Sequence, residues 1–269
     1  MADVPAFEGM GQKALPFLKA LGFHQSRDWF HENTALYESH VKHPLGDLVE
    51  HVSARMEAEG LPLRGARKTS LYRVNRDIRF AKEKHPYNTH ASAMLTRSGT
   101  KKDQGFCYVH MSNERSFIAT GFYGLGSAEL AAFRHAITDK SKQLLPLLDR
   151  LKDDGLEFDF SEGLKRNPRG FEKIEDERLQ SIIRLKNFHF VREIDNAVLT
   201  TPSIADDMIA LTHQTLPFLE FGWAAIDPVR EEEALRNARC PNDRSVSMEG
   251  LCSTSAAIAG GSHGDPSRV

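Results

Sequence analysis

Residues 91–122, ASAMLTRSGTKKDQGFCYVHMSNERSFIATGF, decide the fold. This stretch contains three short runs dominated by alternating, β-branched or aromatic residues, as is typical of β-strands: 91–95, 106–111 and 117–122. The two gaps between the runs contain Gly, Asn and Ser, which suit hairpin turns. We therefore predict three consecutive antiparallel strands. The stretch does not alternate strand with helix, as a parallel sheet would require.

Helical periods flank the predicted strands on both sides. Apolar residues three and four apart predict helices over 15–21, 28–37, 45–56, 130–137, 144–151 and 204–218. Pro44 suits the first turn of the third helix, and Ser203 with Asp206 resembles a capping box before the last. Residues 69–74 and 188–194 resemble two further strands. The predicted fold class is α+β, an antiparallel sheet flanked by helices.

Composition bounds the remaining organisation. We predict a single α+β domain over residues 1–227 and a disordered tail over 228–269, which is rich in Ser, Gly, Ala and Arg and has little periodicity. The chain lacks an apolar run of the ~20 residues that cross a bilayer, and its first residues do not resemble a secretory leader. Three cysteines without CxxC spacing suggest neither a disulfide framework nor a zinc site. We expect a cytoplasmic protein with no membrane partner, no metal and no cofactor.

Positive charge is concentrated in one segment. The chain carries 35 basic and 37 acidic residues, so its overall charge does not suit coating nucleic acid. Between residues 64 and 102, however, eleven basic residues face two acidic ones: Arg64, Arg67, Lys68, Arg73, Arg76, Arg79, Lys82, Lys84, Arg97, Lys101 and Lys102 against Asp77 and Glu83. Converging Arg and Lys side chains bind phosphate or carboxylate oxygens well. This segment therefore predicts a local anion site.

Part of this segment also carries a family resemblance. Residues 70–89, SLYRVNRDIRFAKEKHPYNT, closely resemble the signature of the hypothetical-protein family catalogued as domain of unknown function 2461. Other motifs of that family resemble three further segments in the expected order: Arg27-Asp28-Trp29-Phe30-His31-Glu32-Asn33, Gly121-Phe122-Tyr123 with Leu130, Arg134 and Ile137, and residues 164–171, LKRNPRGF. Together they cover roughly residues 13 to 225.

The resemblance implies a fold and a set of site positions, because this family has no settled activity. Two departures from its pattern matter. Residues 124–126 replace a Pro that commonly follows the Gly-x-Tyr motif, and Glu175-Asp176 stands where relatives have His-Pro. If that His were catalytic in relatives, this protein would lack it.

The leading hypothesis is an anion site with residues drawn from the signature and from a second basic loop. The predicted ligand-binding residues are Arg73, Arg76, Arg79, Lys82, Lys84, Tyr87, Thr89, Lys165, Arg169 and Asn33. Lys165, Arg166 and Arg169 would act as a lid if the fold brings them close. Tyr87 is equally explained as a packing residue after Pro86. Trp29, Phe30 and Tyr37 with Asn33 either form a stacking surface or pack in the core.

The sequence gives weaker evidence for catalytic residues than for an anion site. Asp77, His85 and His90 are candidate general acids or bases, which leaves enzymatic activity undecided. The glycine-rich residues 121–127 either receive a phosphate before a helix or simply make a tight turn. Cys107 lies in a predicted strand, and we interpret it as a buried apolar residue.

Three functions therefore stay open. The first is a pocket for a phosphate-bearing small molecule or nucleotide. The second is a nucleic-acid-binding module, with Trp29, Tyr72, Tyr87 and Phe106 available for stacking. The third is a scaffold in which Arg73, Arg76 and Arg79 form a structural salt-bridge lattice with Asp77 and with carboxylates such as Asp28, Glu32 or Glu129. Oligomeric state is left open.

Overall fold

A four-stranded antiparallel sheet forms the centre of the molecule. In this computed structural model, which describes residues 6–79 and 83–239, the strands are β1 (Ala91–Thr96), β2 (Phe106–Met111), β3 (Ser116–Phe122) and β4 (Phe188–Ile194), in the order β1-β2-β3-β4. Neighbouring strands pair in register, for example Tyr108 with Met94 on one side and with Ala119 on the other. The predicted α+β class and the predicted meander are confirmed.

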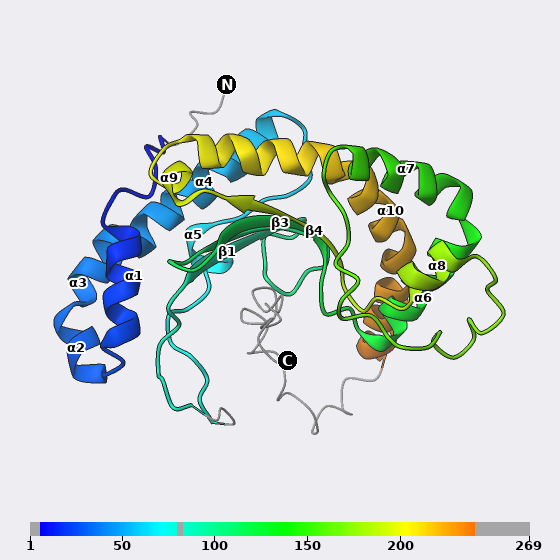
Figure 1. Cartoon of the computed structure of the whole chain (residues 1–269), viewed down its shortest axis with the longest axis horizontal. Helices are drawn as coiled ribbons and strands as arrows, with labels where there is room; N and C mark the ends of the chain where they lie inside the picture. Colours follow the sequence, from blue (N-terminus) through cyan, green and yellow to red (C-terminus); the bar gives the residue numbers. More distant parts are fainter. Residues whose placement is uncertain (1–5, 80–82, 240–269) are drawn as a thin grey trace, which may run out of the picture.

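Helices pack on one face of the sheet and at its two ends, so the molecule is an arch (Figure 1). Five helices come before the first strand. The first four, with a π-helical turn among them, are α1 (Ala14–Phe23), α2 (Arg27–Glu32), α3 (Thr34–Tyr37), η1 (Glu38–Lys42) and α4 (His43–Ala58). The short α5 (Arg67–Ser70) follows, and then come α6 (Ser127–Asp139), α7 (Ser141–Asp153), α8 (Glu177–Ile183), α9 (Asn196–Leu199) and α10 (Ser203–Arg239). α4 and α10 lie along one face, with α1–α3 at one end and α6–α8 at the other.

Local signals explain most helix starts. Ser26 caps α2 by accepting a hydrogen bond from the Trp29 amide, 3.2 Å. Pro44 lies in the first turn of α4, as predicted. The helix predicted over 28–37 is interrupted, because α2 ends at Glu32 and Asn33 lies between α2 and α3. The predicted capping box at α10 is replaced by other contacts: the Ser203 hydroxyl lies 2.6 Å from that of Thr201, and Asp206 pairs with Arg55.

The strand predicted over residues 69–74 is wrong. Residues 67–70 form α5, and only an isolated bridge joins Leu71 to Ala93 of β1. The Lys101 ammonium explains this, because it donates to the carbonyls of Thr69 and Leu71, each at 2.7 Å. Those carbonyls are therefore bound by a side chain instead of a strand partner.

The disordered tail predicted from Pro228 is partly wrong, since α10 continues through Pro228 to Arg239. Arg230 anchors this end of the helix: its guanidinium is 2.5 Å from Asp103 of the β1–β2 hairpin and 3.5 Å from Glu129. Arg97 likewise pairs with Asp227 at 2.6 Å and stacks over Trp223. Residues 240–269 lie outside the described residues.

The core lies between the sheet and its helices. One cluster of buried apolar residues extends from Phe7 to Ile226, and its aromatic centre includes Phe122, Phe133 and Phe218. Cys107 is fully buried there and burial raises the pKa of its thiol to about 12, so it packs as an apolar residue, as predicted. Within the described residues, no helix is long and apolar enough to cross a membrane.

Candidate functional site

The basic signature forms a ribbon-like loop that leaves the edge of β1. Asn75 bridges to Tyr87, the Arg76 amide donates to the Pro86 carbonyl (2.8 Å), and the Asn88 amide donates to the Val74 carbonyl (2.8 Å). Residues 74–76 therefore run antiparallel beside residues 86–88. Lys82, predicted to bind the ligand, lies outside the described residues. We call residues 71–90 the basic loop.

One side of the basic loop packs against the helices at the end of the arch. Tyr87 is 6% exposed, and its ring stacks on Phe30 with 4.4 Å between centroids. Its amide donates to the Gln25 side chain at 3.1 Å. Thr89 is exposed near Gly22 of α1. The packing explanation for Tyr87 is thus the one the structure favours, because a buried ring stacked on Phe30 is part of the fold.

Two cations of the basic loop, Arg79 and Lys84, bind other groups of the same loop. Arg79 donates to both oxygens of Asp77 (2.8 Å and 3.1 Å), and Lys84 donates to the Ile78 carbonyl (2.8 Å). Arg73 and Arg76 are exposed, and Arg73 adds its charge to that of Arg79 beside Asp77. The described part of the loop carries four basic residues, Arg73, Arg76, Arg79 and Lys84, against Asp77 and Glu83. It keeps an excess of positive charge.

Other arginines between residues 64 and 102 form salt bridges with carboxylates. Arg67 pairs with Asp47 (2.6 Å) and Glu50 (2.9 Å), and Arg97 pairs with Asp227. Glu129, predicted as a partner for the signature, instead lies 3.5 Å from Arg230 and accepts from the Gly126 amide at 2.8 Å. Of the predicted lattice contacts, the Arg79 to Asp77 pair is the one that forms among the described residues.

The three candidate acids and bases occupy different surroundings. The Arg79 guanidinium lowers the pKa of Asp77 to about 2, so this carboxylate is ionised at neutral pH. His85 is exposed, 3.8 Å from Glu83. His90 is half-buried and stacks on His110 with 4.5 Å between ring centroids, and burial lowers its pKa to about 4.

The other predicted site residues lie away from the basic loop or have local partners. The Asn33 amide donates to the Trp29 carbonyl at 2.8 Å, which explains its position at the end of α2. Lys165 and Arg169 are exposed on the loop between α7 and α8, at the opposite end of the arch from residues 71–90 (Figure 1). The structure therefore does not bring this predicted lid against the basic loop.

The sequence analysis missed the second face of the sheet, which faces into the arch. Strand register places twelve residues on it in three rows, which we call the aromatic face: Ser92, His110, Phe117 and Glu193; Met94, Tyr108, Ala119 and Val191; and Thr96, Phe106, Gly121 and His189. Residues of the opposite parity contact α10, as when Thr120 hydrogen-bonds to Thr215 at 2.8 Å. The aromatic face has its own small cluster of buried apolar residues, separate from the core.

Ser92 and His110 of the aromatic face are buried, His189 is half-buried, and Glu193 at its margin is exposed. Desolvation lowers the pKa of His110 to about 3 and that of His189 to about 4, so both are uncharged at neutral pH. The Tyr108 hydroxyl is 3.3 Å from His110 Nδ1. Two buried atoms of this face, Ser92 Oγ and His189 Nδ1, have no hydrogen-bond partner in the described structure. Most buried polar groups in native proteins have a hydrogen-bond partner, either in the protein or in an ordered water molecule.

Tyr72 joins the basic loop to the aromatic face. Its amide donates to the Ser92 carbonyl at 3.0 Å, so Tyr72 extends the first row by one position, next to Ser92. Its ring meets that of Tyr108 edge-on, 6.0 Å between centroids. Arg73 follows directly in the chain. The positive loop and the aromatic face therefore meet at one corner of the sheet.

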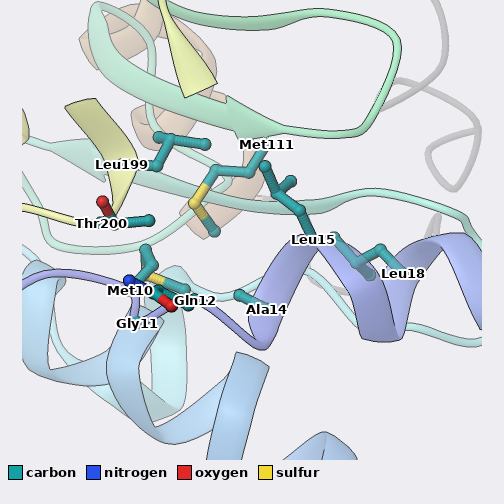
Figure 2. Close-up of a pocket in the computed structure, with 9 residues that line it drawn as sticks. All are labelled: Met10, Gly11, Gln12, Ala14, Leu15, Leu18, Met111, Leu199 and Thr200. Carbon is teal, nitrogen blue, oxygen red and sulfur yellow. The ribbon is translucent and has the colours of Figure 1, made fainter. Parts of the chain in front are cut away.

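Two hollows elsewhere are weaker candidates. Figure 2 shows a small apolar pocket between the start of α1, Met111 and Leu199, with a volume of about 30 Å³. A larger, open hollow of about 580 Å³ lies beside the end of α4, where Glu57, Arg64 and Thr100 line it. Its exposed charges have both signs, so it does not select an anion. No group of three or more potential metal ligands occurs among the described residues.

The fold and this site define an α+β protein whose antiparallel sheet has one helix-covered face and one aromatic face bordered by a basic loop. The chain belongs to the family described as "Conserved hypothetical protein (DUF2461)", whose model matches residues 13–221. The family resemblance of the motifs is thus confirmed. No curated protein and no solved structure matches the chain.

Two family motifs outside the basic loop have structural roles. Arg134, 8% exposed, donates to the carbonyls of Ile183 (2.7 Å), the last residue of α8, and of Leu185 (2.9 Å) just after it. Asn167 accepts from Arg184 Nε at 2.8 Å and donates to the Phe171 carbonyl, so it ties residues 164–171 to the end of α8. These contacts position the loop after α7 and need no ligand.

Proposed function

We propose that the protein binds a small anionic molecule, phosphate-bearing or nucleotide-like, with its acidic group held by the basic loop at Arg73 and Arg76. The observation that carries the proposal is the excess of positive charge in the sequence of residues 73–84, which contain five basic residues against Asp77 and Glu83. A fork of Arg donors is suited to phosphate or carboxylate oxygens.

The surroundings favour a small molecule over a nucleic-acid strand. A single-strand binder needs accessible aromatic rings along a basic track. Here Tyr87 and Phe106 are buried, and Trp29 packs between Phe17 and His24. The basic loop also ends two residues before Ser92, whose buried Oγ has no hydrogen-bond partner among the described residues.

Thermal-shift measurements test this function. Inorganic phosphate, nucleotides and sugar phosphates should raise the melting temperature of the wild type, and Arg76→Gln should abolish the shift. Arg166→Gln is the matched control, because it removes the same charge from the exposed loop at the other end of the arch. Absence of a shift with every anion, or equal loss in both variants, would refute the proposal. Single-stranded DNA serves as the test of the nucleic-acid alternative.

A further inference from the structure

The larger hollow, beside the end of α4, is big enough to hold a small molecule. Its volume is about 580 Å³, within the range of about 300–1,000 Å³ that is typical of small-molecule sites. Its lining comes from the last turns of α4, from the chain between α4 and α5, and from residues 98–100 in the loop between β1 and β2. We call it the α4 hollow.

The lining of the α4 hollow is held in place by the fold. The Gly65 amide donates to Ser53 Oγ at 3.0 Å, which joins the chain after α4 to the helix itself. The Ser98 amide donates to Asp103 at 2.9 Å and fixes the loop between β1 and β2. Leu63, which also lines the hollow, is 1% exposed and belongs to the core. The hollow is therefore preformed, as ligand sites usually are.

Two charged residues of opposite sign line the α4 hollow without pairing. Glu57 and Arg64 are both exposed, and neither side chain forms an ion pair or a hydrogen bond in the part of the chain that the structure describes. The nearby Glu59 does pair, with His213 at 2.8 Å. A ligand with a single charge would meet a like charge as well as an opposite one, and like charges repel. A ligand with both charges compensates both residues, so the hollow suits a molecule that carries an ammonium and a carboxylate.

Neutral hydrogen-bonding groups lie beside the arginine. Arg64 Cγ would be only 3.5 Å from a Cβ added at Gly99, so this side chain runs along the loop between β1 and β2. The hydroxyls of Ser98 and Thr100, 3.0 Å apart, line the hollow there. A hydroxyl can both donate and accept, which suits the N–H and C=O groups of an amide. The lining therefore offers partners for two charged ends and for amides between them.

We propose that the α4 hollow binds a short peptide with free ends, whose ammonium group pairs with Glu57 and whose carboxylate pairs with Arg64. A guanidinium fork matches a carboxylate through two parallel hydrogen bonds. A sphere with the volume of the hollow is roughly 10 Å across, and an extended tripeptide also spans roughly 10 Å. The lining shares no residue with the basic loop, and the inference does not depend on the proposed function.

Isothermal titration calorimetry with three tripeptides tests this inference. Trialanine has both charged ends, N-acetyl-trialanine lacks the ammonium, and trialanine amide lacks the carboxylate. Trialanine should bind saturably at one site per chain, and each blocked peptide should bind about tenfold more weakly, the effect of one lost charged hydrogen bond. No binding of trialanine, or equal affinity for all three peptides, would overturn the inference.

Variants assign each end of the peptide to its residue. Glu57→Gln should weaken trialanine binding about tenfold and leave the affinity for N-acetyl-trialanine unchanged, because that peptide has no ammonium to lose a partner. Arg64→Gln should weaken trialanine binding by a similar factor and leave the affinity for trialanine amide unchanged. Both side chains are exposed and unpaired in the described structure, so the melting temperatures should stay at the wild-type value. If either variant weakens all three peptides equally, the assignment is wrong.

Three control variants separate this site from other charged surfaces. Glu175→Gln and Arg166→Gln remove exposed charges from the segment between α7 and α8, and both should leave the affinity for trialanine unchanged. Arg76→Gln should also leave it unchanged; loss of trialanine binding in that variant would place the peptide on the basic loop and overturn the inference. If phosphate fails to bind while trialanine binds as expected, the proposed function fails and the peptide site is supported.

Discussion

The two faces of the sheet are built by alternating residues of the same strands, but they differ in whether their buried polar groups have hydrogen-bond partners. On the helix-covered face, the Thr120 hydroxyl is 2.8 Å from that of Thr215, which in turn donates to the Leu211 carbonyl. On the aromatic face, Ser92 Oγ and His189 Nδ1 have no partner in the described structure. A buried polar group without a hydrogen bond costs stability. The fold therefore satisfies the buried polar groups of one face, whereas it leaves two buried polar atoms of the other without a protein partner.

The largest effect is expected on the helix-covered face. Phe218 of α10 is 1% exposed and contacts Phe122, Phe133 and Phe190. Phe218→Ala should lower the free energy of unfolding by about 3–5 kcal/mol, because it leaves a cavity in the core. Urea denaturation measures this. A loss below about 1 kcal/mol would show that this face is not the main source of stability.

Arg134 tests whether a buried cation on the helical side is structural. Arg134→Met should cost about 2–3 kcal/mol of unfolding free energy, since the carbonyls of Ile183 and Leu185 lose a charged donor. Urea denaturation should also show that phosphate binding survives in the folded variant. Loss of ligand binding at unchanged stability would instead assign Arg134 to a site.

The aromatic face should make stability depend on pH. The folded-state pKa values of His90, His110 and His189, about 4, 3 and 4, lie below the value near 6.5 of an unfolded chain. The unfolded state therefore binds more protons below pH 6.5, so the stability is complete above that pH and falls as the pH is lowered toward 4.

Substitution of His110 tests how much one of these histidines contributes to the pH dependence of stability. Between pH 7 and pH 5, His110→Gln should lose about 2 kcal/mol less unfolding free energy than the wild type, because one buried imidazole no longer has to remain neutral. Urea denaturation at pH 7, 6 and 5 measures the difference, above the range in which Asp77 titrates. Parallel pH profiles for the two proteins would contradict the burial of His110.

The smallest expected change in stability comes from comparing one serine on each face of the sheet. Ser116→Ala should cost about 1 kcal/mol, as it removes hydrogen bonds to the Ser112 carbonyl and to Asn196. Ser92→Ala should leave the stability of the ligand-free protein unchanged or slightly higher, because the removed hydroxyl has no partner to lose. Thermal melts compare the two. A Ser92→Ala loss as large as that of Ser116→Ala would mean that Ser92 is structural.

Local patterns were enough to predict the sheet and most helices. The runs at 106–111 and 117–122 match β2 and β3 almost residue for residue, because buried strands carry their signal in every position. What failed depended on distant contacts. The Lys101 side chain binds carbonyls some 30 residues earlier and prevents a strand there, and Arg230 holds the end of α10 to Asp103. Neither contact leaves a mark in the local sequence.

The same difference between local patterns and distant contacts applies to the candidate site. Charge clustering identified the basic loop, because its residues are neighbours in the chain. The aromatic face takes Ser92 from β1 and His110 from β2, but His189 comes from β4, which α6, α7 and α8 separate from the first three strands in the chain. Only the pairing of β4 with β3 brings His189 onto this face. One signal was present: His90, Ser92, Met94 and Phe106, Tyr108, His110 are alternate residues, and a strand with polar rings on alternate positions presents them on one face.

A crystal structure of the protein soaked with inorganic phosphate tests the central claim most directly. We expect density for the anion at the basic loop, beside Arg76. Density only at other surfaces, or a basic loop left empty at saturating phosphate, would contradict the proposed anion site.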